Sequence, residues 1–151
     1  MTLRFPYQLV SVGHPIYPLG GRSERPRPIL GVTVIGPADS RLREAILDSA
    51  ADDTVFSEAL AIQLGLDLRH APVGRGQGVG LVNAPLRYAE VTLRITDGHE
   101  RREWRATVGF TSAPLKYPLL GFAGFQQFFT VQLYRDRELA ELTVNSLYPG
   151  K

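Results

Sequence analysis

The sequence contains no cysteine, so disulfide bonds, thiolate metal sites and cysteine nucleophiles are all excluded. No apolar run approaches the roughly 20 residues that a membrane-spanning helix needs. The first residues, MTLRFPYQLV, also lack the long apolar segment and the small-residue cleavage site of a signal peptide. These absences predict a soluble, cytoplasmic protein with no membrane partner.

Lysine is nearly absent as well. Lys116 and Lys151 are the only two, so the sequence pI of about 9.1 mostly reflects arginine. The formal net charge of +2 is small, and no basic run with interleaved aromatic residues is present. Nucleic-acid binding proteins typically carry such a basic footprint. We therefore expect no nucleic-acid partner, and an accessory protein for nucleic acids remains an alternative that rests on arginine content alone.

What is present is the composition of one ordinary globular domain: 151 residues, 44% hydrophobic and 21% charged. The 15 glycines and 11 prolines are spread along the chain and favour turns over long helices. Alternating apolar and polar residues predict a mainly β protein. Strands are expected at 3–10, 29–36, 43–48, 91–95, 104–110, 130–134 and 139–145, a further apolar segment at 116–121, and short helices at 57–64 and around 123–129.

The beginning of the chain differs in composition from the rest. Residues 11–28 are rich in proline and glycine and are expected to form an extended arm or linker. We therefore divide the chain into an N-terminal strand with its Pro/Gly-rich arm, residues 1–26, and a main domain, residues 27–151.

A glycine-rich segment, GRGQGVG at 74–80, raises the possibility of phosphate binding. That use needs a strand before the loop and a helix after it, whereas the residues that follow read as a strand. The segment is therefore predicted to be the tip of a hairpin. The histidines His14, His70 and His99 are far apart in the sequence, so no metal site and no cofactor are expected.

The segment ILDSAADDTVF, residues 46–56, places Asp48 at the end of a predicted strand and follows it with small residues. One carboxylate cannot act as both acid and base on the same water. Two that face each other can, because their proximity makes them share a proton. The chain offers only one such segment, so a dyad would need a second copy of the chain. On residue chemistry alone, an ordinary acidic surface turn is the favoured interpretation.

The order of several segments resembles that of the retropepsin-like aspartic proteases, the single-domain family that includes retroviral proteases. ILDSAADDTVF resembles their D-[TS]-G-A-D-x-T-V segment, and RPILGVTVIG resembles the strand that leads into it. GVGLVNAPLRYAEVTLRI is similar to a glycine-tipped flap with its return strand, and KYPLLGFAGFQQFF to the apolar-apolar-Gly segment and short helix that follow. The resemblance covers roughly residues 27–145.

The resemblance implies a mainly β, closed β-barrel-like acid protease fold with one or two short helices, a flap hairpin and a homodimer. It implies an aspartic endopeptidase that hydrolyses peptide bonds of a peptide or protein substrate, without a cofactor. Asp48 of each subunit would be catalytic, and the C-terminal ELTVN strand, with a contribution from the N-terminal arm, would support the dimer. The implied bracing residues of the dyad are Ser49 and Ala50, and the implied substrate-binding residues are Ala51, Asp52, Asp53 and the flap residues Gly78, Val79 and Gly80.

Two positions depart from the family pattern. Ala50 replaces a glycine that lets backbone approach the substrate and the partner, and a positive φ there would cost on the order of 1 kcal/mol. Phe122 replaces an arginine that pairs with the second aspartate of the motif, here Asp52. The alternative is therefore a weakly active or inactive module of the same fold that binds peptides or forms dimers.

Overall fold

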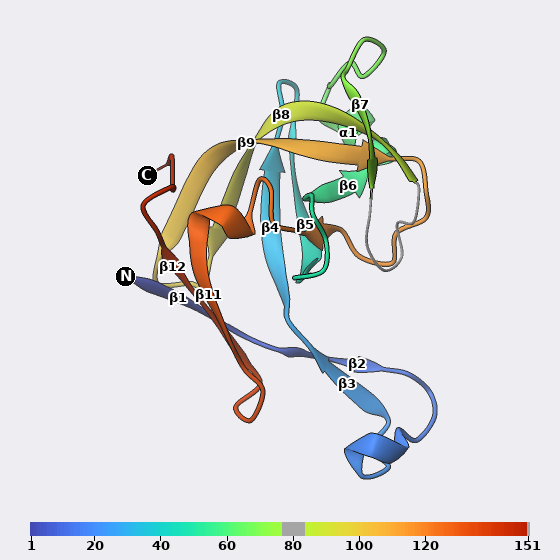
Figure 1. Cartoon of the computed structure of the whole chain (residues 1–151), viewed down its shortest axis with the longest axis vertical. Helices are drawn as coiled ribbons and strands as arrows, with labels where there is room; N and C mark the ends of the chain where they lie inside the picture. The colour runs from blue at the N-terminus through green and yellow to red at the C-terminus, as the bar shows by residue number, and fades with distance from the viewer. Residues whose placement is uncertain (77–83, 151) are drawn as a thin grey trace.

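The computed structural model describes residues 1–76 and 84–150, and these residues form a mainly β protein (Figure 1). The strands are β1 (Thr2–Pro6), β2 (Gln8–Ser11), β3 (Glu24–Arg27), β4 (Ile29–Ile35), β5 (Ser40–Leu47), β6 (Val55–Ser57), β7 (Val73–Gly76), β8 (Ala84–Thr96), β9 (Arg101–Thr111), β10 (Leu119–Leu120), β11 (Phe129–Tyr134) and β12 (Leu139–Val144). The helical elements are α1 (Glu58–Gln63) and the 3-10 turns η1 (Tyr17–Leu19) and η2 (Gln126–Phe128). The mainly β prediction and both predicted short helices are confirmed.

The N-terminal segment is more structured than the sequence predicted. A single strand at 3–10 was expected, but the chain changes its pairing partner at this point. The N–H of Tyr7 still donates to the carbonyl of Glu138, next in the β1–β12 register, whereas Gln8 pairs with Arg27 of β3. Residues 11–28 contain η1 and β3, and β3 pairs with β2 in an antiparallel hairpin. This hairpin projects away from the rest of the molecule (Figure 1).

Seven strands form the main sheet, in the order β4-β5-β10-β6-β9-β8-β7. Strand β4 also pairs with β8, so the pairings run from β4 through β5, β10, β6, β9 and β8 back to β4. The long β8–β9 hairpin turns at Asp97-Gly98, as predicted, and pairs Leu93 with Trp104 on its buried face. The pairings of the main sheet therefore form a closed circuit.

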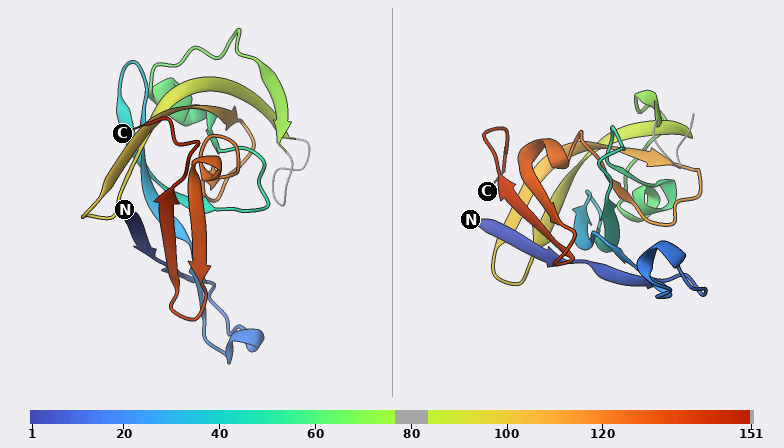
Figure 2. Two further views of the ribbon diagram at one scale, coloured as in Figure 1. Left: turned by 60° about the vertical axis from the view of Figure 1, so that its left-hand side comes forward. Right: turned by 60° about the horizontal axis from the view of Figure 1, so that its bottom comes forward.

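A second sheet joins the two ends of the chain. It has the order β1-β12-β11 and covers an aromatic cluster around Trp104. The rings of Phe125 and Phe129 each lie 5.3 Å from the Trp104 ring, edge to face. The indole N–H donates to the carbonyl of Gly124 at 3.0 Å. Because β1 pairs with β12, the N- and C-termini lie on one side of the molecule in every view (Figures 1 and 2).

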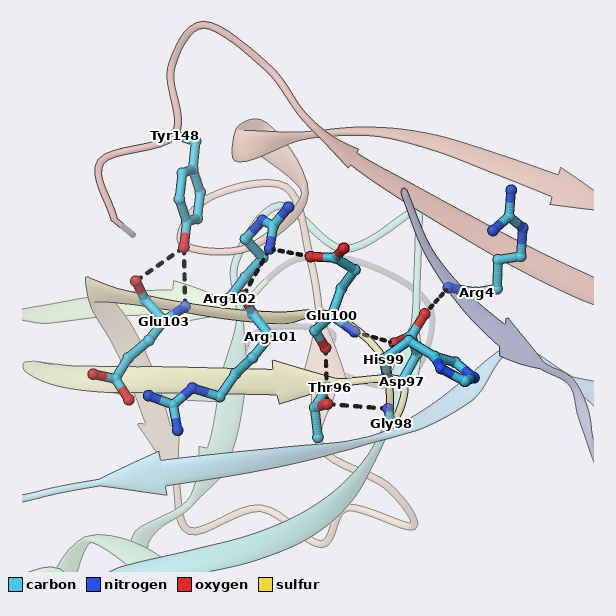
Figure 3. A network of polar contacts seen from close by, with 10 residues as sticks. All are labelled: Arg4, Thr96, Asp97, Gly98, His99, Glu100, Arg101, Arg102, Glu103 and Tyr148. Carbon is cyan, nitrogen blue, oxygen red and sulfur yellow. Dashed lines mark hydrogen bonds and ion pairs between the residues drawn. The ribbon is translucent and has the colours of Figure 1, made fainter. Parts of the chain in front are cut away.

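The β8–β9 turn is held by the side chain of Asp97 (Figure 3). One carboxylate oxygen accepts from the backbone N–H groups of His99 at 2.9 Å and Glu100 at 2.8 Å. The other accepts from the N–H of Arg4 in β1 at 2.9 Å. Partial burial opposes ionisation, but these three donors and the nearby His99 outweigh it and lower the pKa of Asp97 to about 2. The turn thereby ties the N-terminal strand to the main sheet.

Candidate active site

Asp48 directly follows the last residue of β5, at the point where three segments of the main sheet meet. The N–H of Leu47 donates to the carbonyl of Pro28, and that of Asp48 donates to the carbonyl of Leu120 at 3.2 Å. Leu47 and Ala45 point into the core, which fixes the register of β5 and hence the position of the residue after it. The strand terminus predicted for Asp48 is therefore where the structure places it.

The carboxylate of Asp48 makes one intramolecular hydrogen bond within the described part of the chain. Its Oδ1 accepts from the N–H of Ala50 at 3.0 Å, and its backbone carbonyl accepts from Ala51 at 3.2 Å. The side chain is half-buried, whereas Ser49 and Ala50 are exposed. A turn of this kind orients the aspartate, and among the described residues no donor hydrogen-bonds its Oδ2.

Ala50 fits this turn without backbone strain. Among residues 1–76 and 84–150, Glu138 is the only non-glycine residue with a positive φ, so Ala50 avoids the left-handed region. Ala50 is also exposed, so its methyl group is not packed in the core of its own chain. The backbone cost considered for alanine at this position is therefore absent.

Backbone hydrogen bonds attach the following residues to the segment after β10. The N–H of Phe122 donates to Ala51, the N–H of Ala123 to Asp52 at 2.8 Å, and the N–H of Thr54 back to Ala123. This close approach needs glycine at position 121, because a Cβ there would collide with the backbone carbonyl oxygen of Asp53. The Leu-Leu-Gly segment thus holds the aspartate loop in place.

Asp53 has a partner that the sequence did not reveal. The hydroxyl of Tyr88, on β8, donates to its Oδ2 at 3.1 Å. Burial, followed by the negative charge of Asp53 and the hydrogen bond to it, raises the pKa of the Tyr88 hydroxyl. The Tyr88 ring packs against Gly74 on β7, where a Cβ would collide with the ring. The alternation along β8 could have given the face of Tyr88, but its partner comes from the fold.

The side chain of Asp52 is exposed, and in the described residues no cation pairs with it. Phe122, at the position of the family's arginine, is 61% exposed. The predicted loss of that ion pair is therefore seen in the isolated chain. Asp48, Asp52 and Asp53 share one loop, but their surroundings differ.

A cavity of about 580 Å³ opens beside Asp48, Ser49 and Ala50. Apolar side chains of the β4–β5 and β9–β10 regions line much of it, including Ile46 and Leu119. Apolar walls with a few polar groups are typical of ligand sites. The cavity is large enough for a side chain of a bound peptide.

The flap residues Gly78, Val79 and Gly80 fall in 77–83, outside the described residues. In the described residues, no group of three or more His, Asp or Glu side chains is placed to hold a metal ion. None of the described helices combines the length and apolarity needed to cross a membrane.

No protein-family model and no curated protein matches the sequence. Among solved structures, the chain is similar to a retropepsin-like aspartic protease from Rickettsia conorii, with a TM-score of 0.55 and 13% sequence identity. The match covers 94% of this chain and 91% of that protein. The fold resemblance expected from the sequence is confirmed: this chain has the fold of a retropepsin-like aspartic protease.

Proposed function

We propose that the protein is an aspartic endopeptidase that works as a homodimer, with Asp48 of each subunit forming the catalytic dyad. The observation that carries this proposal is the position of Asp48. It follows the buried end of β5, is oriented by its own turn, has one carboxylate oxygen with no hydrogen-bond donor among the described residues, and borders a cavity. Aspartic protease chemistry needs a carboxylate in such a place, brought opposite a second one.

In the proposed reaction, two Asp48 carboxyl groups share one proton, since like charges at contact distance cannot both ionise easily. The ionised carboxylate takes a proton from a water molecule while the water oxygen attacks the peptide carbonyl carbon. The protonated carboxyl gives its proton to the carbonyl oxygen, which yields a tetrahedral diol. Proton transfer to the amide nitrogen then breaks the carbon–nitrogen bond and releases the acid and the amine.

The neighbouring residues take the roles that the resemblance implies. Ser49 and Ala50 brace the pair of loops, Ala51, Asp52 and Asp53 lie along the substrate backbone, and Gly78, Val79 and Gly80 close over it. Tyr88 joins this set as a positioning residue, because its hydroxyl holds the carboxylate of Asp53.

The sheet order changes the expected mode of dimer formation. The ELTVN segment lies largely in β12, and β12 already pairs with β1 on one side and β11 on the other. A strand with both edges occupied cannot add a strand of a second copy. We therefore propose that the outer edge of β11 supports the dimer, because on the outer edge of β1 the N–H of Arg4 is already bonded to Asp97 and Pro6 has no N–H.

The test is cleavage of an unfolded protein at mildly acidic pH, where a shared proton is retained. Asp48→Asn is expected to reduce the rate by at least about 10²-fold, because it removes the acid–base pair. Asp136→Asn, at an exposed aspartate in the β11–β12 turn, is the matched control and should cleave normally. Undiminished cleavage by a correctly folded Asp48→Asn variant would sink the assignment.

A further inference from the structure

The cavity beside Asp48 carries an unusual balance of charge for a site whose other walls are apolar. Three cationic side chains line it: Arg27 at the end of β3, Lys116 between β9 and β10, and Arg135 after β11. Asp48 is the only acidic residue among the lining residues. The cavity therefore holds three positive charges against at most one negative charge, while the whole chain has a formal net charge of only +2.

These three cations are not neutralised by their own chain. No ion pair joins Arg27, Lys116 or Arg135 to an acidic side chain among the residues that the structure describes. The guanidinium of Arg135 lies 5.9 Å from the centre of the Tyr7 ring, an arrangement that holds the side chain without cancelling its charge. By contrast, Arg4, Arg41, Arg69 and Arg94 elsewhere on the surface each have a carboxylate partner.

We propose that this cavity binds an acidic side chain of the substrate, so that the enzyme prefers peptide bonds close to Asp or Glu. The inference rests on the proposed function, since it assigns the substrate class of the same site. Cations that converge in a concave site with apolar walls focus a positive potential there. The apolar lining accommodates the methylene groups of a glutamate, and the cations at its rim pair with the carboxylate.

The size of the preference follows from the exposure of the cations. Lys116 and Arg135 are exposed, and Arg27 is half-buried. Exposed ion pairs each change an equilibrium by roughly one- to fivefold, so the three together predict a preference of about tenfold for Glu over Gln. The preference should weaken with added salt, because exposed charges are screened.

The experiment first locates a cleaved bond in a digest of a denatured protein. It then measures kcat/KM for peptide pairs that differ only by Glu or Gln at each position flanking that bond. We expect a Glu-to-Gln ratio of about ten at one position, reduced roughly two- to fivefold by Lys116→Gln and by Arg135→Gln. Arg101→Gln is the matched control, since Arg101 is an exposed arginine on β9 outside the cavity; it should leave the ratio unchanged.

Two outcomes overturn the inference while the proposed function stands: cleavage that needs Asp48 but shows no Glu preference, or a preference that both cavity variants retain. A change in dimer dissociation would also overturn it, if sedimentation detects that change in Lys116→Gln and Arg135→Gln while the Glu-to-Gln ratio stays unaltered. The cavity would then be a contact between copies.

Failure of the proposed function gives a different result. Cleavage would be absent, or would persist in Asp48→Asn. The charge preference is then measured by binding to the wild-type chain of two fluorescently labelled peptides that carry Glu or Gln at one central position between the same apolar residues. Tighter binding of the Glu peptide, lost in the two cavity variants, supports the acidic site without the enzyme, and equal binding of both peptides overturns it.

Discussion

Asp48 and Asp97 are both aspartates that directly follow a strand, β5 in one case and β8 in the other. Asp97 accepts three backbone hydrogen bonds, two within its turn and one from Arg4 in a different sheet (Figure 3). Asp48 accepts one, from Ala50, and lies beside a cavity. The two carboxylates differ in how many of their oxygens accept hydrogen bonds. Both oxygens of Asp97 accept from backbone N–H groups, whereas only Oδ1 of Asp48 does.

Sequence alone does not separate these two residues, because each is a polar turn residue after an apolar strand. The three donors around Asp97 stabilise its charged form and lower its pKa to about 2. Asp48 has a single donor and so contributes less to the fold. The comparison predicts that substitutions at the two sites will have opposite profiles, one in stability and the other in activity.

The largest effect on stability is expected from Asp97→Ala. It leaves the N–H groups of Arg4, His99 and Glu100 without their acceptor. We expect a loss of about 1–2 kcal/mol in the free energy of unfolding, with the partial exposure of the turn limiting the effect. For a chain of this size that lowers the melting temperature by roughly 2–8 °C. Thermal and urea unfolding measure it.

The control for this prediction is activity per folded molecule. It should match the wild type, because Asp97 lies in a turn away from the cavity that Asp48 borders. A stable Asp97→Ala protein that fails to cleave would mean that the two aspartates are not separated as proposed.

The second prediction concerns acid. The pKa of Asp97 falls from an ordinary value of 3.8 in the unfolded chain to about 2 in the folded one. Its contribution to stability is therefore fully present above about pH 4 and is lost as the pH falls through 2. The stability difference between the wild type and Asp97→Ala should be constant at neutral pH and shrink between pH 4 and 2. A difference that grows on acidification would contradict this origin.

The smallest effect is expected at Ala50, on the Asp48 side of the comparison. Since Ala50 has no positive φ to relieve, Ala50→Gly gains nothing in the folded state and adds freedom to the unfolded chain. We expect a destabilisation of about 0.4–1 kcal/mol and no large gain in cleavage. A strong gain in activity in this variant would instead favour the non-catalytic alternative for the natural chain.

Much of the fold could be predicted because local patterns encode it. The alternation in 91–95 and 104–110 gave the two long strands of the β8–β9 hairpin, and apolar residues at helical spacing gave α1. The aspartate loop was recognisable from its resemblance to a family motif, and its residues Ala51 and Asp52 accept backbone hydrogen bonds from the segment after Leu-Leu-Gly.

The rest depends on pairings between distant residues. The division of the first strand follows from its change of partner, from β12 to β3, and the central place of β12 follows from β1 joining it from the other end of the chain. The bond between Tyr88 and Asp53 likewise joins separate elements. Side chains brought together in this way leave no periodic signal in the sequence, so the basic cavity was also beyond prediction.

The central claim is that Asp48 is kept open in one chain so that it can meet its counterpart in a second. A crystal structure of the assembled protein with a peptide-like inhibitor tests this most directly, through the distance between the two Asp48 carboxyl groups. The account predicts a two-fold dimer in which carboxylate oxygens of the two residues lie about 3 Å apart, close enough to share a proton. A monomer, or a dimer that holds the two carboxyl groups beyond reach of a shared proton, would contradict it.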